Sequence, residues 1–186
     1  MREVSASRGP IAVRADAQRV TPPVMRFVAL VAVLVLGACP REKQADTVVE
    51  TKEPTPKEVT IATRGAIEQW RQAYEVRSID ALERLYSHDP DIVLVNDGVT
   101  LIGWSSVDGM LKDRIARAKE IHIRLKEVQV TSVAPTAAFG VATMTRELSD
   151  GITTVTEYGS LTLVFRKDPN AGWLIVGEHY SYKRPG

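Results

Sequence analysis

Apolar residues recur at helical spacing in the segment that follows residue 61. Ile67, Trp70, Ala73 and Tyr74 fall on one face of a helix, and charged or amide side chains occupy the opposite face. Ser78 is placed to cap a second, shorter helix, because its hydroxyl can accept a free backbone N–H group. The pattern predicts two consecutive helices at the start of a folded domain.

A hairpin and a third helix are predicted next. Two short apolar runs flank Asp97-Gly98, a pair that favours a tight two-residue turn between antiparallel strands. Either Ser105 or Ser106 can then cap a third helix, and Asp108 has the capping-box spacing with Ser105, so we expect a helix to begin at this point.

From Glu120 to the end of the chain, apolar and polar residues alternate, which is the pattern of half-buried strands. Turn-rich segments divide this region into four long strands, and a slip in the alternation predicts a bulge near Glu127. The complete order predicts an α+β fold, a curved, mostly antiparallel sheet that is covered by three N-terminal helices.

This order resembles the nuclear transport factor 2-like superfamily, and within it the SnoaL-like (polyketide cyclase-like) domains. The resemblance covers residues 62–183. It is carried by Trp70 and Tyr74, the segment 78–82, Asn96-Asp97-Gly98 with Gly103, and the closing segment GWLIVGEHYS at 172–181. It implies that the sheet forms a cone around a cavity and that the outer sheet face forms a homodimer.

The N-terminal region carries a different signal. Residues 27–36 are apolar, but as a helix ten residues rise only about 15 Å, half of a membrane core of roughly 30 Å. Arg26 before this run and small residues after it are typical of a signal peptide. The segment that ends in Cys39 resembles the lipobox of bacterial lipoproteins, which implies lipidation of Cys39 and a membrane as partner.

We therefore predict four parts. Residues 1–24 have no apolar periodicity and are interpreted as an upstream segment from a start codon assigned too early, because Met25 begins a complete signal peptide at 25–38. Residues 39–60 are polar and proline-rich and are expected to form a disordered tether. Residues 61–186 form the SnoaL-like domain. The expected location is exported and lipid-anchored, with the outer membrane favoured by Pro40.

Composition excludes several classes of function. The formal net charge of +1 lacks the strong positive field that nucleic-acid binding requires. Cys39 is the single cysteine, so no intrachain disulfide can form, and the three histidines have no metal-ligand spacing. We expect no metal, no cofactor and no nucleic acid.

The last predicted strand has two faces, and the sequence leaves open which one lines the cavity. We expect the face with Trp173 and His179 to be the interior one, which makes His179 the sharpest candidate for proton transfer. With the opposite parity, Glu178 and Tyr180 take its place. A purely structural histidine is the competing interpretation.

Asp97 and Glu157 are the carboxylates that could work with His179 as an acid-base pair. Asp97 is also explained by its turn, and Glu157 could lie at a solvated edge. Aromatic residues could line a ligand cavity or could simply be core. The candidates are Trp70, Tyr74, Tyr86, Trp104 and Trp173.

The leading hypothesis is a membrane-anchored lipoprotein that binds a small apolar molecule or a protein partner without turnover. The alternative is an acid-base enzyme of the isomerase, cyclase or hydrolase type, using His179 with Glu157 or Asp97. A third hypothesis is a dimerisation module whose cavity is filled by its own aromatic side chains.

Overall fold

The computed structural model describes residues 52–184, so the predicted signal peptide, Cys39 and most of the tether lie outside the described residues. Helices and strands follow the predicted order. They are α1 (Pro56–Glu75), α2 (Ile79–Glu83), β1 (Val93–Asn96), β2 (Val99–Ile102), α3 (Trp104–Arg117), β3 (Glu120–Ala134), β4 (Ala137–Ser149), β5 (Thr154–Asp168) and β6 (Gly172–Lys183).

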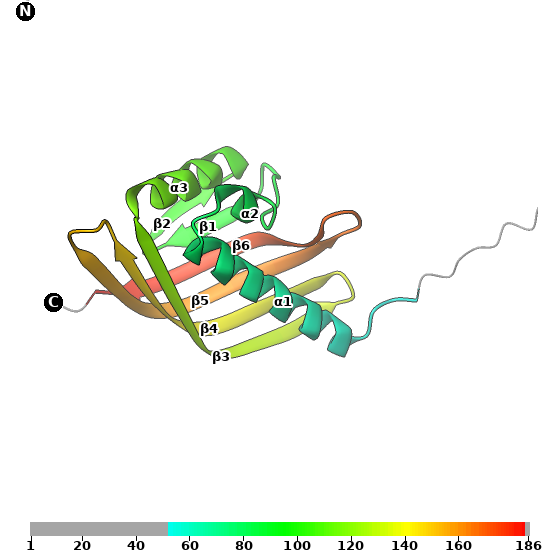
Figure 1. Cartoon of the computed structure of the whole chain (residues 1–186). Helices are drawn as coiled ribbons and strands as arrows, with labels where there is room; N and C mark the ends of the chain where they lie inside the picture. Colours follow the sequence, from blue (N-terminus) through cyan, green and yellow to red (C-terminus); the bar gives the residue numbers. More distant parts are fainter. Residues whose placement is uncertain (1–51, 185–186) are drawn as a thin grey trace, which may run out of the picture. The chain divides into compact units, whose positions relative to one another are not determined.

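The six strands form one open, curved sheet in the order β2-β1-β6-β5-β4-β3. All neighbours are antiparallel except β1 and β6, which run parallel. The helices lie on one face of the sheet, and α1 crosses β3 and β4 (Figure 1). We call this the helix-covered face and the opposite one the outer face. The predicted α+β fold is confirmed.

Helix α1 begins earlier than the predicted domain boundary at residue 61. Thr55 accepts the N–H of Glu58, and the Glu58 carboxylate accepts the N–H of Thr55, which together form a capping box. Val59 is buried in the core. The predicted tether is therefore too long at its C-terminal end, because polar residues in a capped first turn resemble a linker in composition.

The predicted hairpin turn and the predicted bulge are confirmed, but the predicted start of the third helix is not. The hairpin turn has positive φ at both Asp97 and Gly98, and Glu127 has the positive φ of the predicted bulge. Helix α3, however, begins at Trp104 with Gly103 as its N-cap, without a side-chain cap. The predicted capping role of Ser105 or Ser106 is wrong, since the left-handed backbone of Gly103, at φ 82°, starts the helix earlier.

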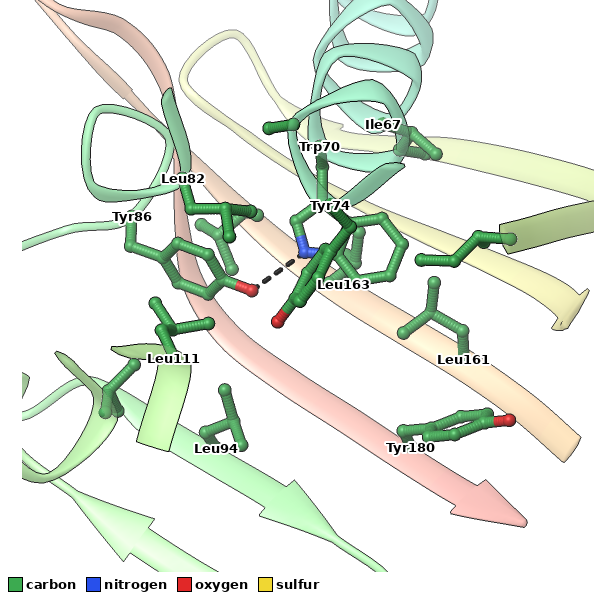
Figure 2. Packing of buried hydrophobic residues seen from close by; sticks show 14 of the residues in the cluster. Ile67, Trp70, Tyr74, Leu82, Tyr86, Leu94, Leu111, Leu161, Leu163 and Tyr180 are labelled. Carbon is green, nitrogen blue, oxygen red and sulfur yellow. Dashed lines mark hydrogen bonds between the residues drawn. The ribbon is translucent and has the colours of Figure 1, made fainter. Parts of the chain in front are cut away.

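Aromatic side chains fill the core under α1. Trp70 and Tyr74 on α1 are completely buried and meet edge to face, and the Trp70 indole N–H donates to the Tyr86 hydroxyl at 2.8 Å (Figure 2). Leu82, Leu111 and Leu163 surround them, and Tyr180 lies farther along the sheet. The space between α1 and this part of the sheet is therefore packed with side chains.

A bulge in β6 decides which residues face the helices. Val164 pairs with Gly177 and Phe165 pairs with Ile175, so one residue of β6, Val176, has no partner on β5. The alternation changes phase there. As a result, both Ile175 and Glu178 are buried on the helix-covered face.

Candidate functional site

A cleft with a volume of about 430 Å³ opens beside the packed core. Its walls come from the C-terminal half of α3, the end of β4, the start of β5, the loop between these two strands and the end of β6. Met110, Leu148 and Val155 contribute apolar surface, and the polar wall contains Asn96, Asp113, Arg114, Arg117, Arg146, Ser149, Asp150, Thr153, Glu157, Tyr182 and Arg184.

An ion pair lies at the inner wall of this cleft. Arg146 on β4 and Glu157 on β5 are direct cross-strand partners, and both are buried, at 2% and 1% exposure. The Arg146 Nε and Nη2 groups donate to Glu157 Oε2 at 2.8 and 2.6 Å, and Arg184 Nη2 donates to Oε1 at 3.0 Å. Two guanidinium groups thus share a single carboxylate.

Two tyrosine rings of β6 pack against the Arg146 guanidinium. Its guanidinium lies 4.6 Å from the centroid of Tyr180 and 5.8 Å from that of Tyr182, within the range of cation-π attraction. The Tyr180 hydroxyl is buried and has no hydrogen-bond partner within residues 52–184. Burial is the main cause that raises the pKa of Tyr180 to about 12.

Arg114 on α3 is a second cation at the cleft, and its partners are neutral. Its Nη1 donates to the Tyr74 hydroxyl at 3.1 Å and its Nη2 to Asn96 Oδ1 at 3.3 Å. In residues 52–184, no carboxylate forms an ion pair with Arg114 within 4.0 Å. Arg114 is partly exposed, so part of its charge faces the cleft.

The exposed acidic groups of the cleft already accept hydrogen bonds from the protein. Asp113 accepts the Nε–H of Arg117 at 2.8 Å. Asp150 accepts the backbone N–H groups of Ile152 and Thr153, each at 2.8 Å, and these bonds, above all that of Thr153, lower the pKa of the Asp150 carboxyl. The cleft therefore presents more available cationic than anionic groups.

The model of the SnoaL-like domain family matches residues 64–185, well over half of the chain. The chain belongs to the SnoaL-like domain family. Solved structures with the nuclear transport factor 2-like fold agree with this assignment. No curated protein sequence matches the chain.

Three similar structures are informative about the fold. A proposed dehydratase of the nuclear transport factor 2-like family from Streptomyces avermitilis has TM-score 0.63 and 23% identity, covering 69% of this chain and 99% of that chain. A nuclear transport factor 2-like superfamily protein from Salmonella enterica serovar Typhimurium has TM-score 0.58 and 20% identity, covering 68% and 89%. A proposed scytalone dehydratase from Novosphingobium aromaticivorans has TM-score 0.59 and 11% identity, covering 66% and 83%. At these identities the likeness shows the fold alone.

The predicted acid-base residues do not come together in the SnoaL-like domain. His179 is exposed on the outer face, so its predicted place in the cavity is wrong, and the β6 bulge is the reason. Asp97 is exposed in its turn. Glu157 does line the cleft, but its partners are Arg146 and Arg184, not His179. The opposite strand parity, with Glu178 and Tyr180 inside, is the one observed.

The predicted ligand-binding aromatics are core or surface residues here. Trp70, Tyr74 and Tyr86 are buried, Trp173 packs partly buried against the core, and Trp104 stacks on His88 with ring centroids 4.1 Å apart. Tyr86 also donates its hydroxyl to the buried Glu178 carboxylate, and burial followed by the Glu178 charge raises the pKa of Tyr86. None of the five predicted aromatics lines the cleft.

Sequence reasoning missed Arg114 and Arg146. Arg146 has the same parity as the buried residues Ala142 and Met144, so a charge on an otherwise apolar strand face was the available signal. Arg114 precedes the core residue Ile115, and nothing in the spacing separates it from ordinary surface arginines of α3.

Other features of the described chain are less suited to be a site. A hollow of about 680 Å³ lies between α1 and β3, but none of its polar side chains is buried. Residues 52–184 contain no cluster of His, Cys, Asp or Glu side chains fit to hold a metal ion. Among these same residues, no helix has the length and apolar character needed to cross a membrane.

Proposed function

We propose that the SnoaL-like domain binds a small molecule in the cleft beside Arg146 and does not transform it. The observation that carries this proposal is the open cleft of about 430 Å³, which has an apolar wall and a buried, fixed ion pair. Ligand sites combine these features, because apolar surface supplies affinity and a few fixed polar groups supply orientation. The aromatics that fill the core do not extend into this space.

Turnover by acid-base chemistry has little support from the cleft. None of the three histidines, all within residues 52–184, belongs to its lining. Both oxygens of Glu157 already accept hydrogen bonds from guanidinium groups, so this carboxylate is occupied by protein partners and is not free to contact a substrate. The enzyme hypothesis based on His179 with Glu157 or Asp97 therefore has no assembled pair.

Native mass spectrometry of the protein purified from its host tests the binding proposal. We expect a co-purifying small molecule in the wild type and its loss in Val155→Trp, because Val155 lines the cleft and a larger side chain fills it. Val164→Trp is the matched control, since Val164 lies on the same strand with similar exposure, 43% against 39%, but outside the cleft. Equal occupancy of the two variants would contradict binding in this cleft.

We further propose that the chain is an exported lipoprotein held in a membrane through Cys39. The support is the signal-peptide pattern of residues 25–38 and the lipobox-like segment before the single cysteine. Two or more acyl chains on one residue make attachment effectively permanent. Cys39→Ser is expected to move the protein from the membrane fraction to the soluble fraction, and an unchanged distribution would disprove anchoring through this residue.

The outer face of the sheet is proposed as a homodimer surface. Val93 on β1, Phe139 and Val141 on β4 and Val164 on β5 are exposed on it, and Gly177 of β6 lies between Val93 and Val164 in the register. No helix within residues 52–184 covers this face (Figure 1). An exposed apolar sheet face of this kind is typical of an interaction surface.

A further inference from the structure

We propose that the ligand of the cleft is an organic acid, with its carboxylate bound by Arg114 and Arg184 and its apolar body placed against Met110, Leu148 and Val155. This inference rests on the proposed binding function and adds the chemical class of the ligand.

The lining of the cleft contains four arginines and three carboxylates, which leaves one guanidinium group in excess. Arg114, Arg146 and Arg184 converge from α3, from β4 and from the end of β6, and Glu157 is the only carboxylate bonded to any of them among the described residues. Asp113 and Asp150 already accept other donors, and Glu178 lies in the core with the Tyr86 hydroxyl as its partner. An added anion would balance the excess of guanidinium groups.

Arg114 has hydrogen-bond donors that its partners do not use. A guanidinium has five N–H donors, and Arg114 uses two of them, both on neutral acceptors. The Glu178 carboxylate attracts Arg114 but forms no hydrogen bond with it, so the remaining donors of this partly buried cation have no bonded carboxylate among the described residues, which costs free energy. A carboxylate can accept two parallel N–H bonds from such a group, so binding it would remove this cost.

The cleft is large and part of its wall is apolar. A volume of about 430 Å³ far exceeds a bare acetate or phosphate ion and lies in the range of about 300–1,000 Å³ that suits drug-sized molecules. Met110, Leu148 and Val155 offer carbon surface without further donors. These features select an acid that carries an aromatic or branched aliphatic body over a small inorganic anion.

The experiment is isothermal titration of the full-length chain with 2-naphthoate and with its neutral counterpart 2-naphthamide. We expect the acid to bind at least tenfold more tightly, because the two probes share their apolar body and differ in the charge that meets the guanidinium groups. Arg114→Gln should weaken 2-naphthoate binding by roughly tenfold to hundredfold, the value of a charged hydrogen bond, and should weaken 2-naphthamide binding much less, because the amide loses no attraction between opposite charges. Retained amide binding also reports that the variant is folded.

Arg184→Gln is a second test, because Arg184 is mostly exposed and Glu157 keeps both bonds from Arg146 when Arg184 is replaced. This variant should also weaken the binding of 2-naphthoate more than the binding of 2-naphthamide. Arg124→Gln is the matched control, since Arg124 is an exposed arginine paired with Glu147 outside the cleft, and this variant should bind both probes like the wild type.

The outcomes separate the inference from the function on which it rests. Equal affinity for the acid and the amide, with both lost in Val155→Trp, would overturn the organic-acid inference and leave the binding function intact. An equal loss in Arg114→Gln and Arg124→Gln would also overturn it, since the effect would then be one of overall charge. If neither probe binds at millimolar concentration, both the inference and the binding function are wrong.

Discussion

Arg146 and Glu157 are two charged side chains that are almost completely buried, at 2% and 1% exposure. Removing ions from water costs several kcal/mol each, and the mutual attraction compensates only when the geometry is good. Here two N–H groups of Arg146 reach one carboxylate oxygen, Arg184 covers the other, and aromatic rings pack against the Arg146 guanidinium. The pair is therefore expected to be a rigid wall of the cleft.

Arg146→Met should lower the free energy of unfolding by about 3–5 kcal/mol, because Glu157 is left buried with only the exposed Arg184 as its partner. The double variant Arg146→Met/Glu157→Leu should regain most of this loss, since no unpaired charge remains. Urea denaturation followed by circular dichroism measures both. A double variant as unstable as the single one would show that packing, and not the unpaired carboxylate, sets the cost.

The raised pKa of Tyr180 predicts how the stability of the fold depends on pH. Its pKa in the folded chain is about 12, against about 10 in an unfolded chain. Between pH 10 and 12 the unfolded chain therefore loses this proton first, so the stability present below pH 10 falls as the pH rises. Tyr180→Phe removes this contribution, and its urea midpoint should fall less steeply above pH 10 than that of the wild type.

The same variant should not destabilise the protein at pH 7. The Tyr180 hydroxyl is buried without a partner within the described residues, so its removal costs no hydrogen bond and relieves a desolvated polar group. We expect a gain of up to about 1 kcal/mol. A loss of more than about 1 kcal/mol at pH 7 would indicate that the hydroxyl has a bonded partner after all.

Strand β6 shows how one element limits what a sequence can predict. Its apolar alternation correctly predicted a half-buried strand, and its turn residues predicted its ends. Val176, however, lies in a bulge that the residue types of this strand do not predict. Because this single position has no partner on β5, His179 lies on the outer face and Glu178 on the helix-covered face. Fold and element order were therefore predictable, whereas the identity of the inward residues after the bulge required the register.

Helix α3 limits prediction in another way. Val107 and Leu111 on its buried face were recognisable from their spacing. Arg114 lies at the border of that face and reaches Tyr74 on α1 and Asn96 on β1, contacts that join distant parts of the sequence. Candidate site residues of this type can be identified only when the packing of the elements is known.

The contact of α1 with the sheet depends on a glycine in β4. A Cβ atom at Gly140 would lie 2.6 Å from Ile67 Cδ1, which is too close, so α1 packs against the strand where a side chain is missing. Gly140→Ala should destabilise the domain by about 1–3 kcal/mol, as overpacked cores do. Ile67→Val removes the clashing methyl group, so Gly140→Ala/Ile67→Val should be more stable than Gly140→Ala in thermal unfolding.

Additive effects of the two substitutions would contradict the proposed contact between Gly140 and Ile67. If Ile67→Val lowers the melting temperature of the wild type and of the Gly140→Ala variant by the same amount, the two sites do not interact, and the close approach of α1 is not what Gly140 permits.

At the scale of the described domain, the two sheet faces differ in what covers them. Three helices and the aromatic core occupy one face and leave the cleft at its margin, whereas the outer face remains uncovered (Figure 1). His179, expected in the cavity, is instead paired across the strands with Thr162 and Val95 on this outer face. If the proposed dimer forms there, the charged groups of the cleft stay available to a ligand.

The dimer proposal leads to a prediction about one valine in the middle of the outer face. Val164 lies between Gly177 and Phe139 in the register, so a lysine there would be buried without a partner when two copies meet. Val164→Lys should raise the dimer dissociation constant by roughly 100-fold or more, because an unpaired buried charge costs several kcal/mol.

Ile61→Lys is the control, since Ile61 is an exposed aliphatic residue of α1. Sedimentation velocity should show a dimer for the wild type and Ile61→Lys and a monomer for Val164→Lys. A wild type that sediments as a monomer at all concentrations, or a Val164→Lys variant that remains dimeric, would remove the outer face as the interface and leave its exposed valines without a partner.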